Sequence, residues 1–234
     1  MNLLHSIDAL ERVLQLNDNI ASLSLARFAL LPPGDQRATL DDASKNAVLR
    51  ARELRTSLKL PFWDAAMLMT VNGSGKTPGL FAAAAFHNKP LRPLISIARS
   101  DLSSAPLSDV PQDEILAVLS KVQMQDGTSR HIPMLDFHAP TSDVSEAIVC
   151  ELLQFLGCRG YVLASGKSYH FIGVDLLNED QFAGFLGSAL LFSPIIDRTW
   201  LAHQLLEGMC ALRISGRPGY GGPPELRASL GVPG

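Results

Sequence analysis

Apolar and polar positions follow two different periods along the chain, and the first period predicts helices near the N-terminus. Between residues 2 and 31, leucine, isoleucine and valine recur every three or four positions, the spacing of one face of an α-helix. A Pro-Pro-Gly sequence then ends this predicted helix. Asp41 and Asp42 precede an alanine- and arginine-rich run over residues 43–60, and acids before such a run favour a second helix. We therefore expect an N-terminal helical segment over residues 1–60.

Beyond residue 60 the apolar positions form short runs punctuated by Gly and Pro, a texture typical of strands and helices that follow one another. A strand is expected around Asp136 and another over residues 211–215, whereas residues 115–124 fit either a helix or a strand. The tail from Gly216 is too rich in Gly and Pro for regular structure. Helices are predicted over residues 79–86, 144–156, 181–191 and 197–208. The mixture favours an α+β domain over residues 61–234, with a sheet covered by helices.

Composition limits the class of protein without pointing to one activity. A chain of 234 residues that is 47% hydrophobic can bury a sizeable core and is globular rather than disordered. Its formal net charge of -3 argues against a broad basic surface, so any nucleic-acid binding must use basic groups placed locally. The basic side chains of residues 43–60 form either a solvated helix face or such a local contact.

Cysteine usage and the lack of long apolar stretches favour a cytoplasmic protein with no membrane partner. Three cysteines without CxxC spacing predict buried thiols rather than a disulfide framework or a zinc site. The N-terminus lacks the continuous apolar core of a secretory signal. The most apolar later window, residues 184–196, falls short of the ~20 residues that cross a bilayer.

Residues 72–77, Asn-Gly-Ser-Gly-Lys-Thr, match the end of a phosphate-binding P-loop, whose backbone amides and lysine surround nucleotide phosphates. The full pattern needs a glycine five residues before Gly75, where this chain has Thr70. A Gly/Ser turn before a helix is therefore preferred over a P-loop ATPase.

The candidate chemistry lies in two later segments that place ionisable groups on apolar runs. In His-Ile-Pro-Met-Leu-Asp-Phe-His, residues 131–138, an extended strand would project Asp136 and His138 on the same side, roughly 7 Å apart along the strand. This pair is a candidate metal-binding site. Alternatively, His138 is a hydrogen-bond partner of Asp136. Burying an unpaired carboxylate costs several kcal/mol, so Asp136 on an apolar strand favours a functional role.

The second segment, residues 160–173, is predicted to form a β-hairpin whose polar turn is Gly-Lys-Ser. The hairpin would bring together Ser165, Lys167, Ser168 and His170, so one sheet face would hold an acid, two histidines and a basic phosphate ligand. Further along the chain, Arg213 between two apolar residues either reaches a phosphate or pairs with a nearby acid.

These two segments resemble the motifs of the archaeo-eukaryotic primase and primase-polymerase superfamily. The strand with Asp136 is similar to the first motif, normally an acidic pair Asp-x-Asp or Asp-x-Glu, and Ser168-Tyr-His170 is similar to the Ser-x-His of the second motif. More specifically, the chain is similar to bacterial primase 1D-like proteins over residues 61–230, and this resemblance is most specific over residues 131–215. The resemblance implies a primase-polymerase-like core, with an RRM-like, mostly antiparallel sheet covered by helices.

The resemblance also implies a function, a cofactor and roles for the candidate residues. It predicts a nucleotidyltransferase of DNA replication that uses nucleoside triphosphates and a divalent metal, Mn²⁺ or Mg²⁺, on a DNA or RNA strand. Asp136 and His138 would bind the metal, and these two residues with His170 would be catalytic. The nucleotide would be held by Ser165, Lys167, Ser168, His170 and Arg213.

Two departures from the family pattern open an alternative. His138 stands where the second acid is expected, and Ser215 ends the strand that normally carries a third carboxylate, although Asp197 could substitute for it. Magnesium prefers hard oxygen donors, so these replacements weaken the metal site. The alternative is a catalytically degenerate primase-like module that binds nucleotide or nucleic acid and acts through a protein partner.

Overall fold

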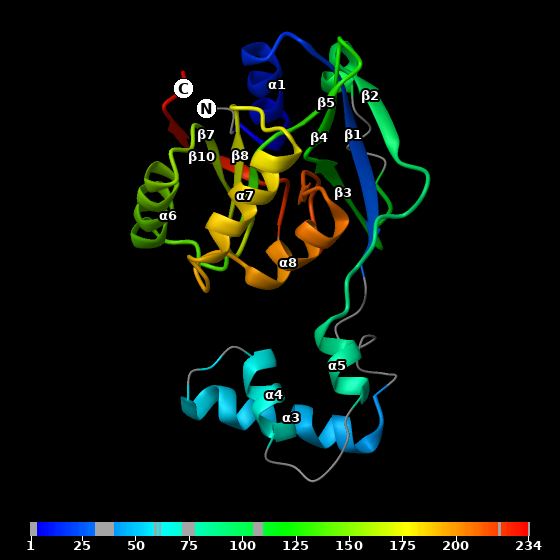
Figure 1. The fold of residues 1–234 in the computed structure, drawn as a ribbon, viewed down its shortest axis with the longest axis vertical. Helices are drawn as coiled ribbons and strands as arrows, with labels where there is room; N and C mark the ends of the chain where they lie inside the picture. Colours follow the sequence, from blue (N-terminus) through cyan, green and yellow to red (C-terminus); the bar gives the residue numbers. More distant parts are fainter. Residues whose placement is uncertain are drawn as a thin grey trace. The chain divides into compact units, whose positions relative to one another are not determined.

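The computed structural model describes residues 4–30, 40–58, 60, 62–71, 78–104, 110–219 and 221–233. The chain divides into two compact units (Figure 1). An α+β unit is formed by Met1–Ala29 together with Pro90–Gly234, and a helical unit is formed by Leu30–Lys89. The predicted boundary at residue 60 therefore lies within the helical unit. The assignment of residues 1–60 and 61–234 to separate domains stays a prediction.

One sheet of the α+β unit has six strands in the order β5-β4-β1-β3-β9, with β2 also paired to β1. Every strand pair in it is antiparallel. The long β1 is the centre of the sheet because it pairs with three other strands. The strands are β1 (Ile20–Ala29), β2 (Ile95–Ala98), β3 (Glu114–Leu119), β4 (Lys121–Met124), β5 (Ser129–His131) and β9 (Ala211–Arg213).

The second sheet has four antiparallel strands in the order β10-β7-β8-β6. Its central hairpin needs a glycine at Gly160, where φ is 152° and an added Cβ would lie 2.3 Å from the carbonyl oxygen of Ile172. The two sheets come into contact through β6 and β9. The strands are β6 (Met134–Asp136), β7 (Gly160–Ala164), β8 (Tyr169–Gly173) and β10 (Glu225–Leu230).

Helices cover the strands of the α+β unit, as Figure 1 shows. Helix α1 packs against β7, β8 and β10, and α6 packs against β10, whereas α7 contacts α8 and β5 and α8 contacts β6. One continuous apolar core runs between these helices and both sheets. The elements are α1 (Ser6–Leu16), η1 (Arg99–Ser104), α6 (Asp143–Phe155), α7 (Glu179–Leu190) and α8 (Arg198–Glu207).

The helical unit contains α3 (Asp42–Leu58), α4 (Phe62–Val71) and α5 (Pro78–Ala84). Asp41 caps α3, because its carboxylate accepts the backbone N–H of Ser44 at 2.7 Å. The unit has its own small core, which is distinct from that of the α+β unit. The chain enters this unit after β1 and leaves it before β2, although these two strands are paired with each other.

The α+β class with antiparallel sheets and an N-terminal helix is confirmed, as are the helices predicted over residues 43–60, 79–86, 144–156, 181–191 and 197–208. Asp197 caps α8, and Gly208 ends it in the left-handed conformation. Residues 115–124 form the strands β3 and β4. The P-loop-like residues 72–77 lie outside the described residues.

Two predictions about secondary structure are wrong. The single helix predicted over residues 2–31 stops at Leu16, and the rest forms β1, whose pairing on both edges outweighs a helix-compatible leucine spacing. The Gly- and Pro-rich tail contains a strand, β10, because its last part changes from turn residues to an alternating pattern. Among the described helices, none combines the length and the apolarity that crossing a membrane requires.

The place of β1 at the centre of the larger sheet predicts a large effect of truncating its buried side chains. Leu25 is fully buried, so Leu25→Ala should lower the free energy of unfolding by about 2–5 kcal/mol. Leu16→Ala, on a side chain that is 49% exposed, should change it by less than about 1 kcal/mol. Urea unfolding followed by Trp200 fluorescence in a Trp63→Phe background reports on the α+β unit, and equal effects of the two variants would contradict the assignment.

Candidate functional site

The structure brings two of the predicted site residues, Asp136 and His170, together on the sheet whose strand β6 contacts β9 of the other sheet. Asp136 on β6 and His170 on β8 are directly opposite each other in the antiparallel register. Their side chains approach within 3.6 Å, measured from Nε2 of His170 to Oδ1 of Asp136, which is slightly longer than a hydrogen bond. The His170 side chain is 9% exposed and the Asp136 side chain 28% exposed. Strand pairing thus fixes an acid and an imidazole side by side at a partly open position.

The turn between β7 and β8 is tied to the end of β6. Its ends are joined by a hydrogen bond from the Ser165 N–H to the carbonyl oxygen of Ser168, at 2.8 Å. The Ser168 hydroxyl donates to the carbonyl oxygen of Phe137, one residue beyond Asp136. Ser165 is buried, and Ser168 is half-buried. These bonds hold the turn against the acid, so the hairpin predicted from the sequence is placed as expected.

Arg213 at the end of β9 is buried and directs its guanidinium at backbone oxygens from three parts of the chain. Nη2 donates to the carbonyl oxygen of Ser165 at 2.6 Å. Nη1 donates to the carbonyl oxygen of Ser215 and, at 3.3 Å, to that of Gly222. Arg213 thereby clamps the β7–β8 turn to the end of β9. Its positive charge lowers the pKa of both Asp136 and His170. A role of Arg213 in nucleotide binding stays a prediction.

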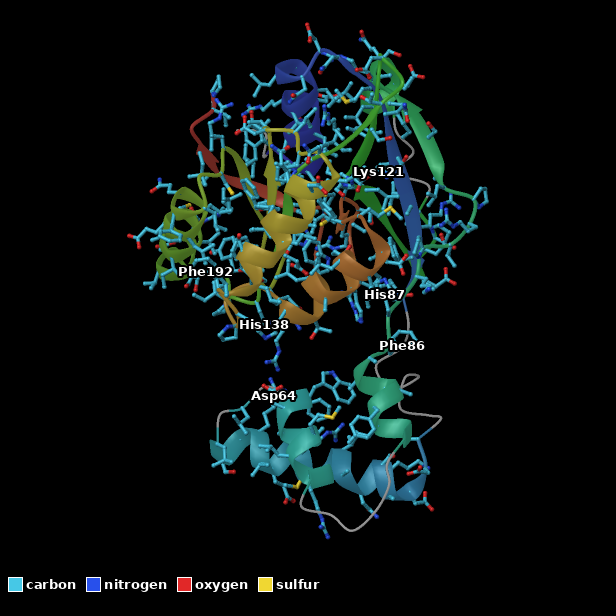
Figure 2. The ribbon with its side chains drawn as sticks, in the orientation of Figure 1. Asp64, Phe86, His87, Lys121, His138 and Phe192 are labelled. Atoms are coloured by element: carbon cyan, nitrogen blue, oxygen red, sulfur yellow. The ribbon has the colours of Figure 1, made fainter. Side chains whose placement is uncertain are left out.

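His138 and Lys167 are both exposed, unlike the residues at the centre of the site. The backbone N–H of His138 donates to the carbonyl oxygen of Ile195 at 2.7 Å, which fixes the chain after β6 beside the segment that leads into α8. Figure 2 labels His138 at the edge of the α+β unit. Lys167 occupies the turn between β7 and β8. The predicted roles of both residues in ligand binding stay predictions.

A second carboxylate, that of Asp197, lies near Asp136. The backbone N–H of Asp197 donates to the carbonyl oxygen of Asp136 at 3.0 Å, and the Asp197 carboxylate raises the pKa of Asp136. Asp197 also caps α8, since Oδ1 accepts the N–H groups of Thr199 and Trp200 at 2.9 and 3.0 Å. The same side chain therefore begins a helix and faces the first-motif acid.

Helix α8 is anchored so that its N-terminus stays beside the site. The indole N–H of Trp200 donates to the carbonyl oxygen of Ala211 at 3.2 Å, and the amide oxygen of Gln204 accepts the Ala211 N–H at 2.9 Å. Both bonds link the helix to β9, the strand that carries Arg213. Trp200 and Gln204 thus contribute to the site by positioning the helix.

The protonation states of the pair are set by burial and by nearby charges. Burial and the Asp197 carboxylate raise the pKa of Asp136 to about 8, although the Arg213 charge opposes this. Burial, together with the charge of Arg213, lowers the pKa of His170 to about 3. At neutral pH the 3.6 Å contact therefore joins a mostly protonated carboxyl group and a neutral imidazole. The pair is a neutral polar centre rather than a salt bridge.

The donors around Asp136 fit a pair of divalent metals poorly. Within the described residues, no group of three or more His, Cys, Asp or Glu side chains is close enough together to hold a metal ion. The buried Arg213 also places a positive charge where a cation would be repelled. Ligation of a metal by Asp136 and His138 stays a prediction, and Asp197 is the additional carboxylate that the chain places near them.

Ser215, the residue that replaces the expected third acid, has a structural role. Its hydroxyl accepts the N–H of Leu116 at 3.0 Å and donates to the carbonyl oxygen of Gly216 at 3.0 Å. The residue is 3% exposed, so a carboxylate at this position would be buried between β3 and the segment after β9.

Sequence reasoning left His131 unassigned, and the structure places it in a buried polar cluster. Its Nδ1 lies 3.2 Å from Oγ of Ser120, its Nε2 lies 3.1 Å from the carboxylate of Glu179, and its ring stacks on Phe182. Ser120 is fully buried and also accepts the N–H of Cys210 at 2.8 Å. Burial lowers the pKa of His131, although Glu179 opposes the shift. The cluster links the residue between β3 and β4 to β5 and α7, and its serine is fully buried, which leaves no access for a substrate.

An open pocket of about 470 Å³ lies elsewhere, at the opposite end of β7 and β8 from Asp136. Its lining includes Arg130, Arg159 and Asp175, and none of the predicted site residues. Arg159 and Asp175 form a two-pronged ion pair at its edge. The candidate site is therefore a cluster at the junction of the sheets and not this pocket.

Comparisons with known proteins were made for the whole chain. A family model described as archaeo-eukaryotic primase 1D-like matches residues 98–222, which include both predicted motifs and Arg213. No curated protein and no solved structure matches the chain.

The opposite pKa shifts of Asp136 and His170 predict a specific pH dependence of stability. Folding raises the Asp136 pKa from 3.8 to about 8, so this group favours the folded state at low pH, and its contribution falls as pH rises to about 8. Folding lowers the His170 pKa from 6.5 to about 3, so its contribution rises with pH up to about 6.5. Between about pH 6.5 and 8 the Asp136 contribution remains alone.

In that window the wild type should lose up to about 1.4 kcal/mol of stability per pH unit through Asp136, and Asp136→Asn should remove this slope. Urea unfolding at several pH values measures the difference between the two proteins. Parallel pH profiles above pH 6.5 would show that Asp136 is already ionised in the folded protein.

Proposed function

Because the chain belongs to the archaeo-eukaryotic primase 1D-like family, we propose that it is a primase-like module that binds a nucleoside triphosphate at the Asp136 and His170 pair. The module would work together with a nucleic-acid strand and a protein partner. The observation that carries the proposal is the neutral pair on β6 and β8, held beside the buried cation Arg213.

The electrostatics of this site suit a phosphate group. A protonated Asp136 would not repel an anion and can donate a hydrogen bond to a phosphate oxygen. Arg213 supplies a buried positive charge that acts on both residues of the pair, and low solvent exposure strengthens its field. The exposed Lys167 lies in the adjoining turn and would add a point charge for the outer phosphates.

Binding is favoured over nucleotidyl transfer because of what surrounds the first-motif acid. A two-metal transfer site needs several carboxylates that stay ionised at neutral pH. Here His138 stands where the second acid would be needed, and Ser215 is engaged in backbone hydrogen bonds. A module that retains the nucleotide site without this acid set fits the geometry best.

Calorimetric titration with ATP and GTP in metal-free buffer tests this proposal. Lys167→Ala and His170→Gln should each weaken binding by about tenfold, the effect of losing one charge-assisted or buried hydrogen bond worth about 1.4 kcal/mol. Lys121→Ala removes an exposed lysine of the other sheet and is the matched control, which should bind like the wild type. No heat of binding in the wild type, or equal losses in all three variants, would refute the proposal.

Nucleotidyl transfer is the second candidate, and the position of Asp197 favours it. Its carboxylate is close enough to Asp136 to raise the pKa of that residue, and a cation bound nearby would oppose this shift. Asp197 would then replace the acid that Ser215 cannot provide.

Primer extension with Mn²⁺ or Mg²⁺ tests the second candidate. If transfer occurs at this site, Asp136→Asn and Asp197→Asn should each reduce it by at least about a hundredfold, as expected for removal of a group acting on the reacting centre. Asparagine still caps a helix, so Asp197→Asn should leave α8 intact. Extension that persists unchanged in both variants would exclude the site, and no extension by the wild type would leave binding as the function.

A further inference from the structure

The two units of the chain differ in the sign of their charge. The helical unit, Leu30–Lys89, contains eight Lys and Arg residues and five Asp and Glu residues, a net formal charge of +3. The whole chain has 20 basic and 23 acidic residues, so the α+β unit carries a net formal charge of -6. A polyanion would thus be repelled on average by the unit that holds the nucleotide site and attracted by the other.

The positive charge of the helical unit is concentrated on α3. Between Lys45 and the end of α3 there are four basic residues and one acid, Glu53. All five of these side chains are exposed. Figure 2 shows nitrogen-tipped side chains that extend outward from this helix. The four basic residues are Lys45, Arg50, Arg52 and Arg55.

Three of these basic residues share one side of the helix. Lys45 and Arg52 are seven residues apart, and Arg55 follows three residues later, which places them along one stripe of an α-helix. The stripe runs beside the buried positions Val48 and Ala51, with which α3 packs on the rest of its unit. All three side chains are exposed, although they follow the same side of the helix as Val48 and Ala51, and Lys45 also pairs with Asp42 at 3.3 Å.

We propose that this stripe of α3 binds the phosphate backbone of the nucleic-acid strand on which the module works. The proposal deepens the proposed function and rests on it, because the strand is the second ligand expected of a primase-like module. Arginine forms bidentate hydrogen bonds with phosphate, and contacts of this kind are independent of base sequence. Without such a local surface, the net charge of the α+β unit would disfavour strand binding.

Fluorescence anisotropy of a labelled oligothymidylate of about twenty nucleotides, titrated with the full chain between about 50 and 200 mM salt, tests this inference. For a single strand, each lost phosphate contact reduces the magnitude of the slope of the logarithm of the binding constant against the logarithm of the salt concentration by about 0.7. Arg52→Gln with Arg55→Gln should therefore reduce the slope by about 1.4. Glu53→Gln removes the exposed acid that follows Arg52 in α3 and should raise the affinity through net charge, which a merely unstable variant would not do.

Arg159→Gln with Arg227→Gln is the matched control, since it removes the same two charges from exposed arginines of the α+β unit, which pair with Asp175 and Glu146. It should leave both slope and affinity unchanged. An α3 double variant that binds with the wild-type slope, no binding by the wild type, or tighter binding to phosphatidylserine vesicles than to the oligonucleotide would overturn the inference.

Failure of this inference is distinguishable from failure of the nucleotide site. The α3 double variant should bind ATP with the wild-type affinity, whereas His170→Gln should bind ATP about tenfold more weakly and keep the wild-type salt slope. Oligonucleotide binding through α3 without any ATP binding would refute the proposed function while supporting the stripe. ATP binding by the wild type, with no effect of the α3 substitutions on oligonucleotide binding, would support the proposed function and refute the role of the stripe.

Discussion

The arrangement of the site depends on one buried cation. The Arg213 guanidinium reaches the backbone oxygens of Ser165, Ser215 and Gly222, which belong to the hairpin turn of one sheet and to the chain that follows the edge strand of the other. Removing it would leave the carbonyl oxygens of Ser165 and Ser215 without this donor in a region that solvent barely reaches. Its charge also acts on both members of the neighbouring pair, so the same side chain fixes the geometry of the site and its protonation.

That double role accounts for the combination of an elevated carboxyl pKa and a depressed imidazole pKa within 3.6 Å of each other. In water, an acid and a histidine at this distance would form an ion pair. Burial disfavours both charged forms, and the arginine makes a second cation at His170 still less favourable. The outcome is a pair that can donate and accept hydrogen bonds without carrying charge. Such a pair suits an anion whose charge is balanced by other groups, such as the arginine.

The sequence predicted the parts of the fold whose signals are local. The hairpin over residues 160–173 followed from two apolar runs around a Gly-Lys-Ser turn, and the facing of Asp136 and His170 depended only on a third strand joining it. By contrast, β1 has leucines at spacings that suit a helix, and only its pairing with strands some seventy and ninety residues later makes it a strand. The use of Arg213 as a backbone clamp could not be predicted from the sequence either. Its acceptors, such as the carbonyl oxygens of Ser165 and Gly222, come from separate segments of the chain.

The helical unit is inserted between two strands that pair with each other, and a backbone hydrogen bond of 2.7 Å from Leu91 to Arg27 joins the chain on either side of it. Topologically it occupies the position of a hairpin loop. The entropy of closing a loop grows only with the logarithm of its length, about 0.6 kcal/mol per doubling, so the sheet tolerates a long excursion at small cost. Evolution could consequently exchange, enlarge or delete this insert as a cassette without redesigning the scaffold that carries it.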